Sequence, residues 1–138
     1  MAGTPISELL DAVDTLDVEN VMALTAPEAA ILLTDGRRAE GAEAVRELLG
    51  SLLGTLRSAT HAIRSEWHLD GVWIAEVDAT YELHDGLRTA PLPRAFIVHV
   101  GAGGVNEMHV YGAHEHPLDE RREVEGGMRL GGRWLPPL

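Results

Sequence analysis

Acidic side chains alternate with apolar ones along the most regular stretch of the sequence, residues 72–84. Asp78 and Glu82 share one face of the strand predicted there, and Trp73 and Tyr81 share the other. If the acidic face lined an apolar pocket, burial would raise the pKa of both carboxyl groups. Either could then act as a general base, with His99 on the next predicted strand as its acid partner or orienting group.

The same alternation also fits the opposite orientation, in which Trp73, Val77 and Tyr81 face the core and the acids face water. This orientation is favoured because a buried, unpaired carboxylate is costly. A shift of one residue in strand register exchanges the two faces. The sequence therefore leaves both orientations open.

Histidines are concentrated near the end of the predicted strands, where His99, His109, His114 and His116 stand. Histidine titrates near neutral pH, so a group of them on neighbouring strands indicates a shared acid–base role. The candidate catalytic residues are Asp78, Glu82, His99 and His114.

His114, His116 and Glu120 also have a spacing that suits a divalent metal. Pro117 is expected to end the strand before Glu120 can fold back to the two imidazoles. We therefore predict neither a metal site nor a cofactor.

The few aromatic side chains are the candidate substrate contacts. Trp67, Tyr81 and Tyr111 could line a ligand pocket together with Met108, although core or subunit contacts would explain the aromatic residues equally well. These four are the candidate substrate-binding residues.

Composition excludes several classes of protein. The chain has 138 residues, a hydrophobic fraction of 45% and a net charge of −11, which fits one folded domain but opposes binding to nucleic acid or to an anionic membrane. It contains no cysteine, so disulfides and thiolate chemistry are excluded. No apolar run approaches the length of a membrane span, and a cytoplasmic location is expected.

The elements that would position these residues follow from periodicity and turn signals. Asp17 is the expected N-cap of the second helix, and Asp70-Gly71 and Asp85-Gly86 predict type I′ hairpins. Helices are predicted at 6–16, 18–24 and 42–56, and strands at 29–34, 37–40, 60–69, 72–84, 94–100 and 105–114. This order indicates an α+β fold with its helices on one side of a curved sheet.

Several short motifs match one superfamily: Arg38-Ala-Glu-Gly41 before the long helix, Glu76-Val-Asp-Ala-Thr-Tyr81, Asp85-Gly86 and Pro117-Leu118. With the order of elements, they resemble the nuclear transport factor 2-like superfamily, in particular its SnoaL-like and ketosteroid isomerase-like branches. The resemblance covers about residues 6–118. It implies a cone in which three N-terminal helices pack on a strongly curved, mainly antiparallel sheet and enclose a mostly apolar pocket.

The resemblance also implies a choice of functions. Ketosteroid isomerases carry a base aspartate on the strand before the long helix, where this chain has only Asp35 at a turn, and their second aspartate matches Ala95. Steroid isomerase activity is therefore not expected. We favour a cofactor-independent cyclase, isomerase, dehydratase or epoxide hydrolase that acts on a small apolar or polyketide-like substrate, in natural-product biosynthesis for example. The alternative is a non-catalytic binding or dimerisation module.

Two expectations concern the remaining surfaces. Three helices can cover only one face of the sheet, so apolar residues on the other face predict a homodimer through the sheets. Residues 1–118 would form a single domain, followed by a tail at 119–138 whose apolar residues dock as a lid or on the partner subunit.

Overall fold

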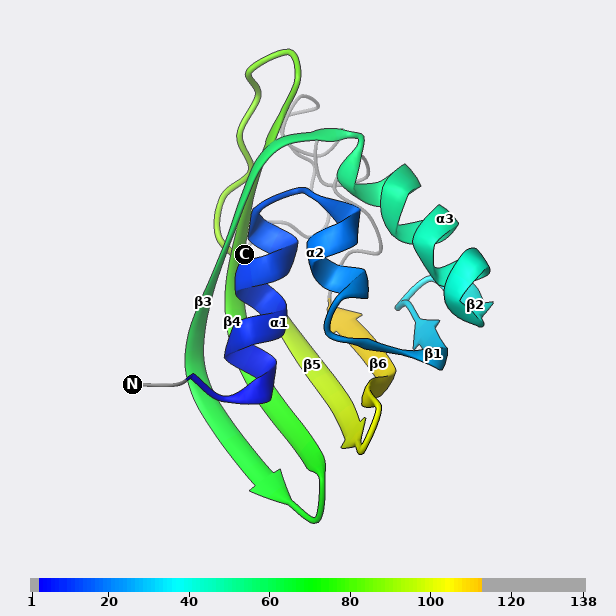
Figure 1. The fold of residues 1–138 in the computed structure, drawn as a ribbon. Coiled ribbons are helices and arrows are strands. Elements are labelled where there is room, and N and C mark those ends of the chain that lie inside the picture. The colour runs from blue at the N-terminus through cyan, green and yellow to red at the C-terminus, as the bar shows by residue number, and fades with distance from the viewer. Residues whose placement is uncertain (1–2, 113–138) are drawn as a thin grey trace.

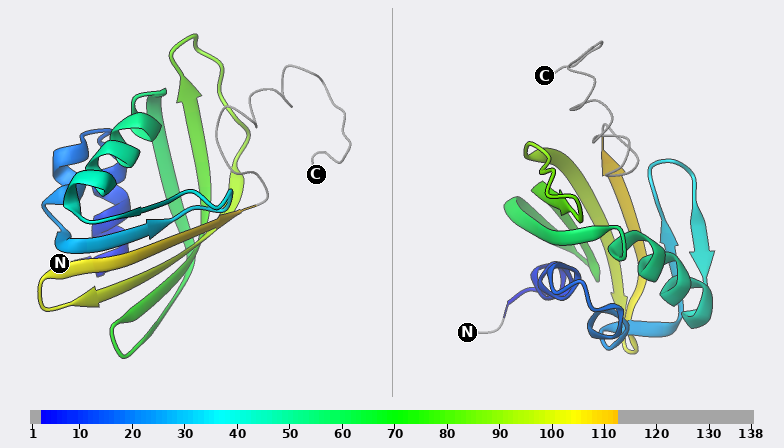
Figure 2. Two further views of the ribbon diagram at one scale, coloured as in Figure 1. Left: turned by 90° about the vertical axis from the view of Figure 1, so that its right-hand side faces the viewer. Right: turned by 90° about the horizontal axis from the view of Figure 1, so that it is seen from above.

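Six strands form one curved sheet, and the helices lie on its concave side (Figures 1 and 2). The fold is taken from a computed structural model that describes residues 3–112. The predicted roles of His114, His116, Glu120 and the tail lie outside this part of the chain. The elements are α1 (Pro5–Asp14), α2 (Val18–Met22), β1 (Thr25–Leu32), β2 (Arg38–Glu40), α3 (Ala42–Leu53), β3 (Leu56–Leu69), β4 (Val72–Leu83), β5 (Leu92–Gly101) and β6 (Gly104–Gly112).

The strands are arranged in the order β2-β1-β6-β5-β4-β3. β1 runs parallel to β6, and every other neighbouring pair is antiparallel. Register shifts within β3, between Leu56 and Ser58 and between Ile63 and Ser65, are irregularities of the kind that bend and twist a sheet. The predicted α+β fold with a mainly antiparallel, strongly curved sheet is confirmed.

The first two helices begin as the sequence indicates. The Thr4 hydroxyl accepts a hydrogen bond from the Ser7 N–H at 3.1 Å, and Pro5 follows it at the first position of α1. Asp17 caps α2 by accepting the Glu19 N–H at 3.0 Å, as predicted. Helix α1 buries Ile6, Leu9, Leu10 and Ala12 against the sheet.

The burial of alternate residues along β4 shows which of the two predicted orientations of this strand is adopted. Ala75, Val77, Ala79, Tyr81 and Leu83 are buried on the concave face. Asp78 and Glu82 lie on the opposite face, which we call the outer face. The orientation favoured by the cost of burying carboxylates is therefore the one that the chain adopts.

One of the two predicted hairpin turns has the expected backbone. Asp70 and Gly71 have φ values of 50° and 80°, as a type I′ turn requires. The type I′ prediction for Asp85-Gly86 is wrong, because only Gly86 has a positive φ, at 91°. The Leu83 N–H donates to the carbonyl of Leu87 at 2.8 Å, so a longer loop joins β4 to the segment before β5.

Gly104 tightens the β5–β6 turn against the start of β1, and its substitution tests this packing. Its φ is 113°, and a Cβ there would lie 2.7 Å from the Leu24 carbonyl oxygen, which already accepts the Val105 N–H at 2.9 Å. We expect Gly104→Ala to lower the free energy of unfolding by about 1–3 kcal/mol in urea titrations. Gly103→Ala is the control, because the nearest atom to its Cβ is 3.7 Å away. Equal stability of the two variants would contradict this role.

No helix within residues 3–112 is long and apolar enough to cross a membrane.

Candidate functional site

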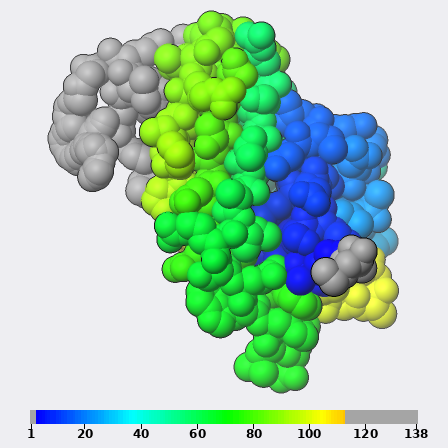
Figure 3. Space-filling view, turned by 90° about the vertical axis from the view of Figure 1, so that its left-hand side faces the viewer, coloured from blue at the N-terminus to red at the C-terminus, as the bar shows by residue number. Residues whose placement is uncertain are grey.

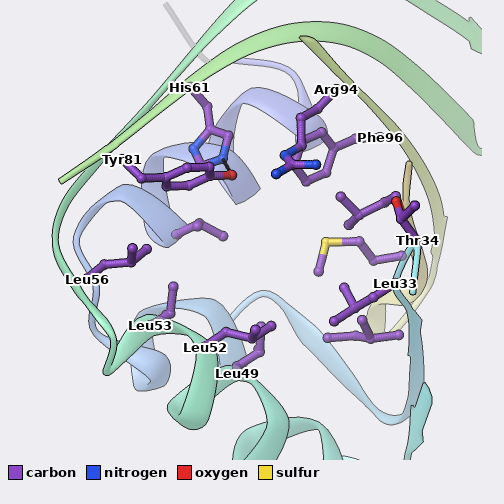
Figure 4. Close-up of a pocket in the computed structure, with 14 residues that line it drawn as sticks. Leu33, Thr34, Leu49, Leu52, Leu53, Leu56, His61, Tyr81, Arg94 and Phe96 are labelled. Carbon is purple, nitrogen blue, oxygen red and sulfur yellow. Dashed lines mark hydrogen bonds between the residues drawn. The ribbon is translucent and has the colours of Figure 1, made fainter. Parts of the chain in front are cut away.

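A cavity of about 100 Å³ lies between the helices and the concave face of the sheet (Figure 4). Its walls come from α1, α3, strands β1, β3, β4, β5 and β6, and the segment after β1. The lining residues are Val13, Ile31, Leu33, Thr34, Leu49, Leu52, Leu53, Leu56, His61, Tyr81, Arg94, Phe96, Met108 and Val110.

The cavity has a polar side and an aliphatic side. In Figure 4, His61, Tyr81, Arg94 and Phe96 lie together, and the leucines at and after the end of α3 lie across the cavity from them. Leu49, Leu52 and Leu53 follow helical spacing, so α3 presents one apolar face to the cavity, and Leu56 at the start of β3 extends it. A bound molecule would place its polar end toward β3–β5 and its apolar body against α3.

Asp14 and His61 form the central polar contact. The carboxylate of Asp14 accepts both the backbone N–H of His61, at 3.1 Å to Oδ2, and the ring nitrogen Nδ1, at 2.6 Å to Oδ1. A carboxylate accepts only from a protonated nitrogen, so the proton of the neutral ring is on Nδ1. Nε2 is then left with its lone pair on the cavity side, 3.2 Å from the hydroxyl of Tyr81.

The imidazole of His61 is buried and packs against two aromatic rings. Its side chain is only 2% exposed, against 24% for Asp14. The rings of Tyr81 and Phe96 both pack edge-to-face on it, each with a centroid separation of 5.6 Å. A buried histidine that is fixed in one tautomer by a carboxylate has the arrangement of an oriented general base.

Arg94 brings a permanent positive charge to the same side of the cavity. Arg94 is 7% exposed, and its Cζ lies 5.9 Å from the centre of the Tyr81 ring, within the range of a cation–π contact. Thr34 is the other polar lining residue, and its hydroxyl donates to the carbonyl of Val110 at 2.8 Å.

Two of the predicted substrate-binding residues, Tyr81 and Met108, line this cavity. Trp67 and Tyr111 are instead 52% and 41% exposed, away from the cavity lining. Tyr111 belongs to the outer face, where its hydroxyl lies 3.4 Å from Nδ1 of His109.

The structure does not bring the predicted catalytic residues together at the cavity. Asp78 lies on the outer face, with its carboxylate 3.7 Å from Arg64. Glu82 accepts a hydrogen bond from the Ser58 hydroxyl at 3.2 Å on the same face. The ring of His99 lies 5.9 Å from that of His109, also on the outer face, and His114 is outside the described residues.

Sequence reasoning missed Asp14, His61 and Arg94 as site residues, although Asp14 and Arg94 each leave a signal in the sequence. Asp14 follows the buried Ile6 and Leu10 at steps of four, so an acid continues the apolar stripe of α1. Arg94 precedes Phe96 and Val98 at steps of two, which puts a cation on a core-facing row of β5.

Within residues 3–112, no group of three or more histidine or acidic side chains is placed to hold a metal ion.

Comparison by sequence gives no match, either to a protein-family model or to a curated protein. Comparison of structures does. A protein from Catenulispora acidiphila DSM 44928 with a ketosteroid isomerase-like fold, solved with trimethylamine, has a TM-score of 0.75 and 11% identity, over 99% of this chain and 100% of that one. A proposed SnoaL-like polyketide cyclase from Shewanella putrefaciens CN-32 has a TM-score of 0.73 and 9% identity, over 86% and 93% of the two chains. The chain has the nuclear transport factor 2-like fold.

An epoxide hydrolase-like protein of the same architecture extends the range of chemistries on this fold. This protein from M. tuberculosis, described as an LEH-like epoxide hydrolase, has a TM-score of 0.71 and 15% identity, over 88% of this chain and 90% of its own. At such identities the likeness shows the fold alone, so the function of this NTF2-like chain is argued from its own residues.

Proposed function

We propose that the chain is a cofactor-independent acid–base enzyme that moves a proton on a small, largely apolar carbonyl compound. The observation that carries the proposal is the Asp14–His61–Tyr81 arrangement at the wall of an apolar cavity. It supplies an oriented base, a carboxylate that stabilises the protonated base, and a hydroxyl donor within 3.2 Å.

In the proposed reaction, Nε2 of His61 removes a proton from the carbon next to the carbonyl group. The C–H bond breaks, its electron pair moves to the carbonyl oxygen, and an enolate forms. Asp14 stabilises the imidazolium, and the Tyr81 hydroxyl turns from Nε2 to the enolate oxygen. Where a C=C bond is conjugated to the enolate, return of the proton from His61 to the far carbon of that bond gives isomerisation. Where the enolate carbon attacks a second carbonyl of the same molecule, the oxygen of that carbonyl takes the proton from His61, and the result is cyclisation.

A non-catalytic binding module is the second candidate, and one observation favours it. Without any ligand, Nδ1 of His61 is bonded to Asp14 and Nε2 faces the Tyr81 hydroxyl, so the imidazole is already satisfied. A module of this kind would bind an apolar ligand in the cavity and leave its protons in place.

Hydrogen–deuterium exchange separates the two candidates without knowledge of the natural substrate. The probes are methyl butyl ketone and γ-acetylbutyrate in D₂O, with exchange next to the carbonyl followed by proton NMR. We expect the parent protein to accelerate exchange, and His61→Asn, which retains a side-chain N–H for Asp14 but lacks Nε2, to reduce the acceleration roughly 10²- to 10⁴-fold. Equal rates with the parent and with His61→Asn would reject the enzyme.

We also propose that two copies of the chain associate through their outer faces. Trp67, Leu69 and Ile74 are 52%, 74% and 36% exposed on the β3–β4 hairpin. The tip of this hairpin projects from the body of the molecule (Figure 3). Large apolar side chains gathered in this way mark an interaction site, and a two-fold pairing would cover both copies at once.

Light scattering tests the association. We expect a dimer at micromolar concentration and a monomer for Ile74→Asp, because the new carboxylate would be buried between the copies. A mass of 14.9 kDa for the parent chain would contradict the pairing.

A further inference from the structure

We infer that Thr89 is a positioning residue for Tyr81, and that its hydroxyl fixes the strand position from which the phenol reaches His61. The inference deepens the proposed function, on which its catalytic meaning rests. It starts from a buried polar side chain that the proposed reaction does not use: Thr89 is 4% exposed, yet it is not among the residues that line the cavity.

The pairing of β4 with β5 ends before it reaches Tyr81. The last pair of this ladder is Ala79 with Leu92, and Tyr81 lies two residues further along β4. Pro91 and Pro93 stand on either side of Leu92, and proline has no N–H to donate to a neighbouring strand. On this side of β4, support for Tyr81 therefore has to come from the segment that precedes β5.

Thr89 supplies this support to both backbone polar groups of Tyr81. The Tyr81 N–H donates to the hydroxyl oxygen of Thr89 at 3.1 Å, and the Tyr81 carbonyl accepts the Thr89 N–H at 2.8 Å. In a regular antiparallel ladder the first of these bonds would go to a backbone carbonyl, so the threonine hydroxyl takes the place of that acceptor. Because a buried N–H needs an acceptor, loss of the hydroxyl would force the strand to shift here.

The position of the strand matters because Tyr81 acts through its outermost atom. Its hydroxyl lies 3.2 Å from Nε2 of His61, and its ring packs edge-to-face on the same imidazole (Figure 4). The phenol oxygen is the side-chain atom farthest from the backbone, so a small rotation of the strand displaces it most. A hydrogen bond weakens steeply as its geometry departs from the optimum. Thr89 therefore affects the proposed hydroxyl donor without touching the substrate.

Nitrogen NMR of the His61 ring tests this support without any substrate. The chemical shift of Nε2 depends on the hydrogen bond that it accepts, so Tyr81→Phe gives the reference value for the lost bond. We expect Thr89→Val to move the Nε2 shift at least half-way to this reference, and Thr89→Ser, which keeps the hydroxyl, to retain the parent value. If Thr89→Val does not fold, Thr89→Ala removes the same hydroxyl and takes its place.

Thr60→Val is the matched control for the change from threonine to valine. Thr60 is an exposed threonine on the outer face of β3, so its replacement should leave the Nε2 shift unchanged. A parent-like Nε2 shift in the Thr89 variants that lack the hydroxyl would overturn the inference.

Deuterium exchange of methyl butyl ketone then tests the catalytic meaning of Thr89. We expect Thr89→Val to lower kcat for exchange roughly 10- to 100-fold and to leave KM unchanged, because the displaced donor acts most strongly on the forming enolate. In a Tyr81→Phe background the same substitution should have no further effect, since Thr89 acts through the phenol. An equal loss in both backgrounds would overturn the inference. A parent protein that does not accelerate exchange would reject the proposed enzyme, and the Nε2 shifts would still decide whether Thr89 positions Tyr81.

Discussion

Substituting Asp14 with asparagine is expected to slow the His61-dependent deuterium exchange roughly 10²- to 10⁴-fold. The carboxylate accepts two N–H groups from His61, at 2.6 and 3.1 Å. An amide offers one acceptor oxygen and one donating NH₂, so one of these bonds must be lost or reversed. Reversal would move the ring proton to Nε2, the nitrogen that has to accept a proton from the substrate.

The tautomer itself provides a readout that a purely structural role would not change. Nitrogen NMR of the histidine ring should show the proton on Nδ1 in the parent protein and on Nε2 in Asp14→Asn. Asp11→Asn is the matched control, because Asp11 is an exposed acid one turn earlier on α1. Unchanged exchange in Asp14→Asn, with the ring proton still on Nδ1, would remove Asp14 from the mechanism.

Local patterns were sufficient to predict most of the fold. The apolar spacing in α1 and α3, the cap at Asp17 and the alternation along β4 are each properties of a few neighbouring residues. These patterns depend on the spacing of residues that are close in the sequence, so they can be read without knowledge of the fold. The Asp85-Gly86 turn was predicted less well, because the dipeptide fits several loops and the pairing of Leu83 with Leu87 decides among them.

The site depended on contacts that local patterns do not contain. Asp14 and His61 are 47 positions apart, and their meeting requires α1 to cross the inner face of β3. The outward direction of Asp78 followed from the register of β4, which alternation alone left open. An acid on the buried stripe of a helix and a cation on a buried row of a strand were visible, but only the fold shows that they share a cavity.

The other large effect is on stability and concerns Leu9, which anchors the helix that ends in Asp14. Its side chain is 1% exposed and belongs to the main hydrophobic cluster between α1 and the sheet. Truncation to alanine removes buried apolar surface and leaves a cavity, so we expect Leu9→Ala to lower the free energy of unfolding by about 2–5 kcal/mol. Domains of this size are typically stable by about 5–15 kcal/mol, so the variant would lose a large share of its stability.

Urea titration measures the loss of stability in Leu9→Ala. The conservative variant Leu9→Met tests whether the volume of the side chain, and not leucine itself, is what the core requires. The urea concentration at the midpoint of unfolding should fall in Leu9→Ala. The slope of the unfolding free energy against urea concentration should stay constant, which shows that the substitution changes the stability of the native state and not its compactness. Leu9→Met keeps the side-chain volume and should cost less than about 1.5 kcal/mol. Because α1 positions Asp14 against His61, deuterium exchange should survive in Leu9→Met. An alanine variant as stable as the methionine variant would mean that α1 does not depend on this contact.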